Sequence, residues 1–220
     1  MGVSLSENEK QSPRPKPKIE GLSDLVFGLA LSIGAITLVE SPPKTSLAIY
    51  ADVGTFALSF YILISIWLRY TRIMSVLPLE RRRTLFANSF LLFCVAIEPF
   101  LFNLLQKPIV GAETSSFLAT ASTLFALDIG GMFLMLGIFC NEIATEDRKL
   151  VAPDLIVTFR KESNTWFLLS AFFFASAIPT FWSIQINGTA VRFLIWIVPL
   201  ALVWLVSVRR RRLIKDQLKS

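Results

Sequence analysis

The chain has 220 residues, of which 54% are hydrophobic and 17% are charged, and its mean hydropathy is +0.60. A soluble domain carries about 25% charged residues, so this composition argues against an ordinary soluble fold and indicates membrane-spanning helices. The net charge of +6 and the absence of histidine bear on function. The basic residues flank apolar segments, which argues against nucleic-acid binding. Because the chain has no histidine, metal sites and general bases that use a histidine side chain are excluded. We expect no cofactor and no enzyme activity.

Residues 1–18 are polar and rich in proline, and we expect them to form a disordered cytoplasmic tail. Six apolar segments follow, and a bilayer core requires roughly 20 apolar residues for each spanning helix. We therefore expect helices at 21–40, 47–68, 84–106, 116–140, 165–186 and 190–208. The predicted fold is an all-α integral membrane protein, with a six-helix transmembrane domain at 19–208 and a basic cytoplasmic tail at 209–220.

The basic residues lie mostly on one side of the predicted membrane domain. They precede the first helix, follow the sixth, and fill the connections between helices two and three and between helices four and five. The other side has only Lys44, Lys107 and Arg192. The positive-inside rule then places both termini in the cytoplasm, where the basic residues can contact anionic lipids. We expect a multi-pass protein of the cell membrane, with the prokaryotic plasma membrane preferred to an organelle.

The longest connection, 141–164, is highly charged and is predicted to be cytoplasmic. Its apolar residues Leu150, Leu155, Ile156 and Phe159 have a spacing that is typical of a short interfacial helix. We therefore expect such a helix here, separate from the fifth spanning helix.

The first helix carries an aliphatic stripe along one side. At 100° per residue, a surface about 100° wide holds Leu22, Leu25, Leu29, Ser32, Ile33, Ile36 and Glu40. Aliphatic rings with one hydroxyl suit a narrow constriction that gates by dewetting, and a ring of Glu40 at the outer mouth would concentrate cations. The same periodicity is typical of any helix that packs inside a bundle, so it leaves both interpretations open.

Polar residues open the same helix near the expected inner membrane boundary. A carboxylate such as Asp24 is costly there unless it is paired, and we expect its partner to be Lys18, Arg69 or Tyr70. We interpret Ser23 and Asp24 as part of a structural polar network that holds the first helix. Asn88 of the third helix is expected to hydrogen-bond between helices.

The opening of the first helix also carries a recognisable signature. Lys18 is followed by Leu22-Ser23-Asp24, an apolar helix and Glu40. This pattern resembles the signature of the transmembrane protein 175 potassium channel family, which has an arginine, three residues, Phe-Ser-Asp, an apolar helix and a final glutamate. The resemblance continues over about the first half of the chain, at Ser59-Phe60, Trp67, Asn88 and Pro99-Phe100. Lys18 and Leu22 replace the usual arginine and phenylalanine, and Tyr70 replaces a usual histidine.

The resemblance implies a homotetramer of six-helix subunits in which four copies of the first helix line a potassium-permeable pore. It places the pore constriction at Leu29, Ile33 and Ile36, and the selectivity hydroxyl layer at Ser32, where the family usually has threonine. Because arginine makes a planar bidentate contact that lysine cannot make, Lys18 implies a rewired polar network.

Two carboxylates inside predicted helices support an alternative function. Asp128 lies near the middle of the fourth helix, and Glu98 precedes Pro99 in the third. An intramembrane carboxylate is a functional-site hypothesis by default, so a proton- or cation-coupled secondary transporter is the alternative. A hydrogen bond from Asp128 to a neighbouring helix, and a hydrated kink at Pro99, are the structural explanations that remain open.

Overall fold

The computed structural model describes residues 18–40, 45–78, 81–106, 114–145, 150–186 and 189–196. Five long helices come first in the chain: α1 (Lys18–Glu40), α2 (Ser46–Met74), α3 (Arg82–Gln106), α4 (Thr114–Ile143) and α5 (Pro153–Ser176). A short helix, α6 (Thr180–Ser183), and an antiparallel pair of strands, β1 (Gln185–Ile186) and β2 (Thr189–Ala190), follow. Residues 191–196 are helical. Apart from Lys18, which begins α1, the two predicted tails lie outside the described residues.

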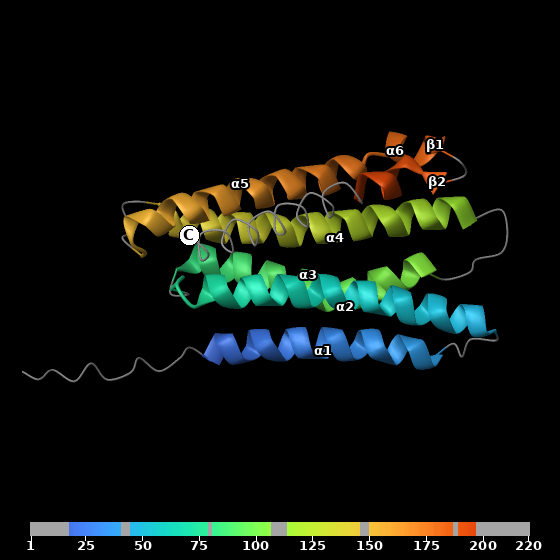
Figure 1. The fold of residues 1–220 in the computed structure, drawn as a ribbon, viewed down its shortest axis with the longest axis horizontal. Helices are drawn as coiled ribbons and strands as arrows, with labels where there is room; N and C mark the ends of the chain where they lie inside the picture. Colours follow the sequence, from blue (N-terminus) through green and yellow to red (C-terminus); the bar gives the residue numbers. More distant parts are fainter. Residues whose placement is uncertain are drawn as a thin grey trace, which may run out of the picture.

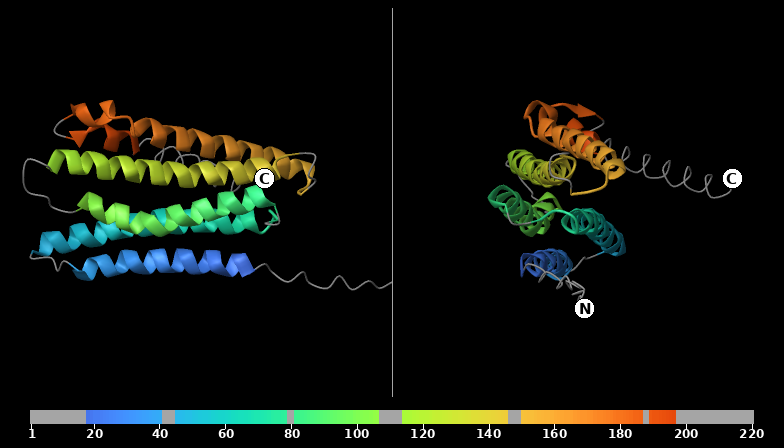
Figure 2. Two further views of the ribbon diagram at one scale, coloured as in Figure 1. Left: turned by 180° about the vertical axis from the view of Figure 1, so that it is seen from behind. Right: turned by 90° about the vertical axis from the view of Figure 1, so that its left-hand side faces the viewer.

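The five long helices lie side by side with their axes roughly parallel (Figure 1). α1 packs on α2 and α3, α3 packs on α4, and α4 packs on α5. The end-on view in Figure 2 shows α1 at one edge of this stack and α5 at the opposite edge. Among the described residues, one side of α1 therefore has no neighbouring helix.

The α4–α5 pair shows why these apolar sequences pack closely. A Cβ atom on Gly137 would lie 2.8 Å from the ring of Phe167, so only glycine fits this contact. Ser163 and Ser170 of α5 donate hydrogen bonds to the carbonyl oxygens of Gly137 and Gly130 of α4, at 2.9 and 2.8 Å. Small residues and hydroxyl groups of this kind hold helices together inside membranes.

Three helices of the described residues are long and apolar enough to cross a membrane. They span Asp52–Met74, Arg82–Gln106 and Ser115–Ile143, and Gly21–Ile36 is a shorter apolar helix. The chain is thus an all-helical membrane protein with several apolar helices. The predicted count of six spanning helices stays a prediction, because residues 197–208 lie outside the described part.

The fifth helix differs from the prediction at both ends. It was expected at 165–186, but α5 begins at Pro153 and ends at Ser176. The segment predicted as a separate interfacial helix is the first part of α5, because nothing between Pro153 and Ser176 interrupts the backbone and proline suits the first helical turn. At the other end the helix stops shortly before Pro179, because proline cannot continue a helix. Hydropathy reports which residues suit the membrane, not where a helix begins or ends.

Candidate functional site

α1 has one face packed against its own chain and one face uncovered. Ser23, Phe27 and Ala30 are at most 1% exposed, and their spacing of three to four residues forms one helix face. The opposite face carries the aliphatic stripe, in which Leu29 is 53% exposed and Ile33 is 45% exposed. The other apolar members of the stripe, at the start and end of the helix, are exposed as well: Leu22, Leu25 and Ile36. The described part of the chain therefore leaves these residues of the stripe uncovered.

Ser32 is the polar residue of the stripe whose side chain the structure describes. Its hydroxyl donates to the carbonyl oxygen of Gly28, one turn earlier, at 2.8 Å. A hydroxyl has one proton and two lone pairs, so the oxygen of Ser32 is left as an acceptor on the exposed side. Glu40 ends α1, and its side chain lies outside the described residues.

A buried hydrogen-bond network fixes the packed face of α1. The phenol oxygen of Tyr70 lies 2.7 Å from Ser23 Oγ and 2.7 Å from Asn88 Oδ1. The phenol has one proton, which it donates to the amide oxygen of Asn88, and it accepts the proton of Ser23. The network joins α1, α2 and α3. The ring of Phe27 adds an aromatic contact to Tyr70, with centroids 5.5 Å apart.

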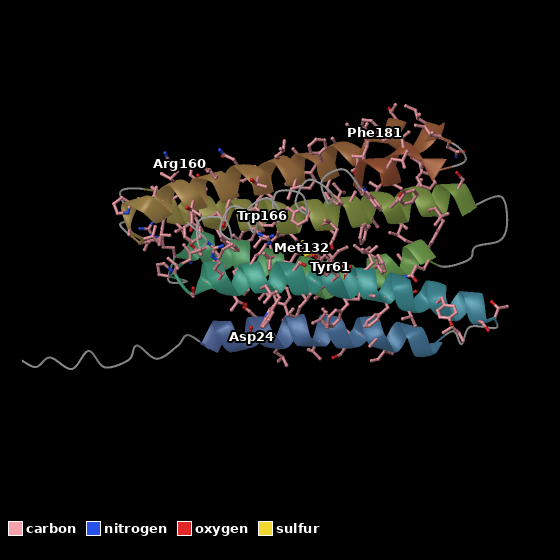
Figure 3. All side chains as sticks on the ribbon, viewed as in Figure 1. Asp24, Tyr61, Met132, Arg160, Trp166 and Phe181 are labelled. Atoms are coloured by element: carbon pink, nitrogen blue, oxygen red, sulfur yellow. The ribbon has the colours of Figure 1, made fainter. Side chains whose placement is uncertain are left out.

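Asp24 has one partner that we did not predict. Figure 3 shows it on the part of α1 that faces α2, and its Oδ1 atom accepts a hydrogen bond from Trp67 Nε1 at 3.1 Å. Arg69 lies over the ring of Trp166 instead, 4.7 Å from its centroid, and the side chain of Lys18 is outside the described residues. The sequence signal for Trp67 is its spacing of three residues from Tyr70, which puts both on one side of α2.

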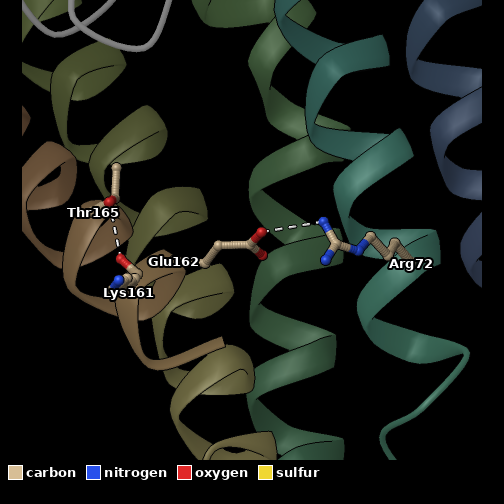
Figure 4. A network of polar contacts seen from close by, with 4 residues as sticks. All are labelled: Arg72, Lys161, Glu162 and Thr165. Carbon is tan, nitrogen blue, oxygen red and sulfur yellow. Dashed lines mark hydrogen bonds and ion pairs between the residues drawn. The ribbon is translucent and has the colours of Figure 1, made fainter. Parts of the chain in front are cut away.

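The C-terminal end of α2 and the first half of α5 are joined by long side chains. Arg72 Nη1 and Glu162 Oε1 form an ion pair at 3.1 Å (Figure 4). The guanidinium of Arg72 also lies over Phe159, 5.5 Å from its ring centroid. This contact exists because α5 begins twelve residues before its predicted start. The α2–α5 contact thus connects the half of the chain that holds α1 to the half that holds α4 and α5.

The two intramembrane carboxylates lie in the interior of the helix stack, away from the stripe. Glu98 is fully buried and accepts hydrogen bonds from Ser59 Oγ at 3.1 and 3.2 Å. Asp128 is 6% exposed, and its Oδ2 atom has no hydrogen-bond partner among the described residues. Within the same part of the chain, no group of three or more His, Cys, Asp or Glu side chains is arranged to hold a metal ion.

A family model for the endosomal/lysosomal potassium channel TMEM175 matches residues 18–99. The match begins with α1 and ends within α3, so it includes both the stripe and the network around Tyr70. Residues 18–99 are therefore similar to the TMEM175 family. The resemblance predicted from the sequence is confirmed over these residues, and the matching family is one of potassium channels.

Solved structures extend the likeness to TMEM175 over most of the chain. A variant of the potassium channel MtTMEM175, crystallised with a nanobody–MBP fusion protein, is 17% identical and covers 96% of this chain and 100% of its own, with a TM-score of 0.59. A lysosomal potassium-selective channel TMEM175 homolog from Chamaesiphon minutus is 18% identical and covers 84% of this chain and 95% of its own, with a TM-score of 0.54. At these identities the structures show the TMEM175 fold. No curated protein matches the sequence.

Proposed function

We propose that the chain is the subunit of a potassium-permeable cation channel whose pore is lined by α1 of each subunit. One observation carries the proposal: the aliphatic stripe lies within the family-matched region and stays uncovered in the single chain. In an assembly about a common axis, the uncovered stripes of several copies can face one another. The potassium channels with the same fold support potassium as the permeant ion.

The position of α1 supports a homotetramer. It lies at the edge of the helix stack (Figure 2), where copies can meet without moving other helices. A Cβ atom on Gly21 or Gly28 would meet nothing within 4 Å in the single chain. Small residues seven apart on the uncovered side of α1 allow neighbouring helices to approach closely.

The chemistry of the stripe suits a selective, gated pore. Rings of Leu29, Ile33 and Ile36 form an apolar constriction that excludes water unless it widens. The oxygen of Ser32, whose proton is used within α1, offers an acceptor to a partly dehydrated cation. Glu40 at the end of α1 supplies negative charge to the outer vestibule. The orientation also keeps both termini in the cytoplasm, where basic residues contact anionic lipids, in a cell membrane of prokaryotic type.

The network around Tyr70 has a structural role in this proposal. Ser23, Tyr70 and Asn88 set the rotation of α1 about its own axis, and Trp67 fixes Asp24 beside them. With this face held, the stripe is directed away from the subunit. A rotation of one residue, about 100°, would turn Leu29 away from the axis.

Ion flux from liposomes tests the proposal directly. Vesicles that contain the purified protein should release potassium faster than empty vesicles. Leu29→Ala should raise the flux and lower the preference for potassium over sodium, because it widens the constriction. Leu168→Ala is the matched control, since Leu168 is 56% exposed and belongs to α5, which lies at the opposite edge of the helix stack from α1 (Figure 2). Equal flux from full and empty vesicles, or equal effects of the two substitutions, contradicts the proposal.

The oligomer is tested by native mass measurement in detergent. We expect a tetramer for the unchanged chain and smaller species for Gly28→Leu, which adds a bulky side chain where the single chain is open. The fold of the monomer should survive this substitution, as measured by circular dichroism. A stable monomer of the unchanged chain contradicts an α1-lined pore.

The buried carboxylates support one other candidate function, a proton- or cation-coupled secondary transporter. The unpartnered Oδ2 atom of Asp128 favours it, and so does a cavity of about 10 Å³ beside Ser59, the hydrogen-bond partner of Glu98. Such a space holds about one water molecule. Saturable, proton-dependent uptake that Asp128→Asn abolishes would favour the transporter over the channel.

A further inference from the structure

Arg192 is a buried arginine between the end of α5 and the first half of α4. It lies in the helical residues 191–196 and is 1% exposed. The sequence places it among the few basic residues on the outer side of the membrane, where exposed arginines contact lipid headgroups. The structure instead surrounds its guanidinium with oxygen atoms from two other helices.

The first set of oxygens comes from the end of α5. Arg192 Nε donates to the carbonyl oxygen of Ser176 at 2.7 Å. Its Nη2 atom donates to the carbonyl oxygens of Ala177 and Ile178, at 3.2 and 3.3 Å. The last carbonyl groups of a helix have no partner within the helix and carry a partial negative charge. The guanidinium therefore caps the C-terminal end of α5.

The second set comes from the first half of α4. Arg192 Nη1 lies 2.9 Å from the carbonyl oxygen of Ala119, 2.6 Å from Ser122 Oγ and 2.8 Å from Thr123 Oγ1. The hydroxyls of Ser122 and Thr123 donate their own protons to the carbonyl oxygen of Ala119, at 3.1 and 2.7 Å. Their lone pairs are thereby left for Arg192. Both hydroxyls act as acceptors in a prearranged cation site.

All of these acceptors are neutral. A buried cation is costly unless hydrogen bonds satisfy it, and here six oxygen atoms meet the five N–H groups of the guanidinium. Trp196 also binds the end of α5, since its Nε1 atom donates a hydrogen bond to Ser176 Oγ at 2.9 Å. These oxygen atoms match the shape and the donors of a guanidinium group, and none of them belongs to a carboxylate.

We propose that Arg192 is a positioning residue, a tethered cation that fills a cation site formed by the broken end of α5 and the first half of α4. Broken helices in transporters use the same carbonyl groups to bind coupling ions. In this chain the site is already filled by a side chain. The α4–α5 half is therefore a fixed scaffold at this end, and no free ion enters the break.

Chemical rescue of Arg192→Ala tests the proposal, with the protein purified in detergent and its thermal unfolding as the readout. The substitution removes the guanidinium from the six oxygen atoms of the cation site, so the melting temperature should fall. Methylguanidinium should restore it in a saturable way, with the folding equilibrium constant rising about tenfold at roughly ten times the dissociation constant. Sodium at the same ionic strength should not. Arg82→Ala, at an exposed position, is the control and should show neither effect.

An unchanged melting temperature for Arg192→Ala, or equal effects of methylguanidinium and sodium, overturns the proposal. If Arg192→Ala yields no folded protein, methylguanidinium present during extraction should recover it, and failure to do so counts against the site. Arg192→Lys gives a second measurement. An ammonium group occupies the cation site without reaching all six oxygen atoms. The melting temperature of Arg192→Lys should therefore be lower than that of the unchanged chain and insensitive to methylguanidinium. A melting temperature equal to that of the unchanged chain would also overturn the proposal.

Discussion

Tyr70→Phe removes the oxygen that connects three helices and leaves the ring in place. Tyr70 is 3% exposed, and Ser23 and Asn88 are 0% and 1% exposed, so water does not replace the lost hydrogen bonds. The hydroxyl of Ser23 can turn to a carbonyl group of its own helix, but Asn88 Oδ1 loses the phenol proton. A buried acceptor without its partner costs about 1–3 kcal/mol, and hydrogen bonds between helices in membranes average about 0.6 kcal/mol. We therefore expect a loss of about 1–2 kcal/mol in the free energy of unfolding.

Reversible unfolding in mixed micelles, followed by circular dichroism, measures this loss. Tyr61→Phe is the matched control, because Tyr61 lies on the same helix and is 64% exposed. The control should change the free energy of unfolding by less than about 0.5 kcal/mol. A double-mutant cycle with Asn88→Ala should give a coupling energy of about 0.5–2 kcal/mol. Equal stabilities for Tyr70→Phe and Tyr61→Phe, or a coupling energy near zero, would refute the network.

Three further predictions concern other contacts. Gly137→Ala should destabilise the chain by about 1–3 kcal/mol through overpacking. Gly54→Ala on α2 is the control and should leave the midpoint of thermal unfolding unchanged or raise it, because its Cβ meets nothing within 4 Å; the opposite order would contradict the packing. Ser32→Ala should lower the potassium-to-sodium flux ratio without changing thermal stability, and an unchanged ratio would exclude a hydroxyl layer. Glu162→Gln should cost less than about 1 kcal/mol in denaturant unfolding, because its partner Arg72 is 53% exposed; a larger loss would show that the ion pair dominates the α2–α5 contact.

The sequence predicted the apolar helices of the first half well because periodicity and signature agree there. α1, α2 and α3 all include their predicted ranges at 21–40, 47–68 and 84–106. The family resemblance at Lys18, Leu22-Ser23-Asp24 and Glu40 is confirmed by the family model and extends in fold over most of the chain. An apolar stripe with a 3.6-residue period contains enough information to define a helix face.

Partners within the membrane were harder to predict. The sequence offered Lys18, Arg69 and Tyr70 as partners of Asp24, and the structure gives Trp67. Arg69 lies over the ring of Trp166 instead, a contact between helices that are far apart in the sequence. Which of several polar groups meets a carboxylate depends on how the helices are placed side by side.

The sequence by itself determined that the chain is a helical membrane protein, that α1 has an aliphatic face, and that α1 opens with a family signature. These are local properties of composition and spacing. Only the tertiary structure decided which face of α1 is covered by its own chain, which partner Asp24 takes, and that Arg192 is buried. The physical reason is that each of these depends on the rotation and register of one helix against another, which arise from packing of residues distant in the chain.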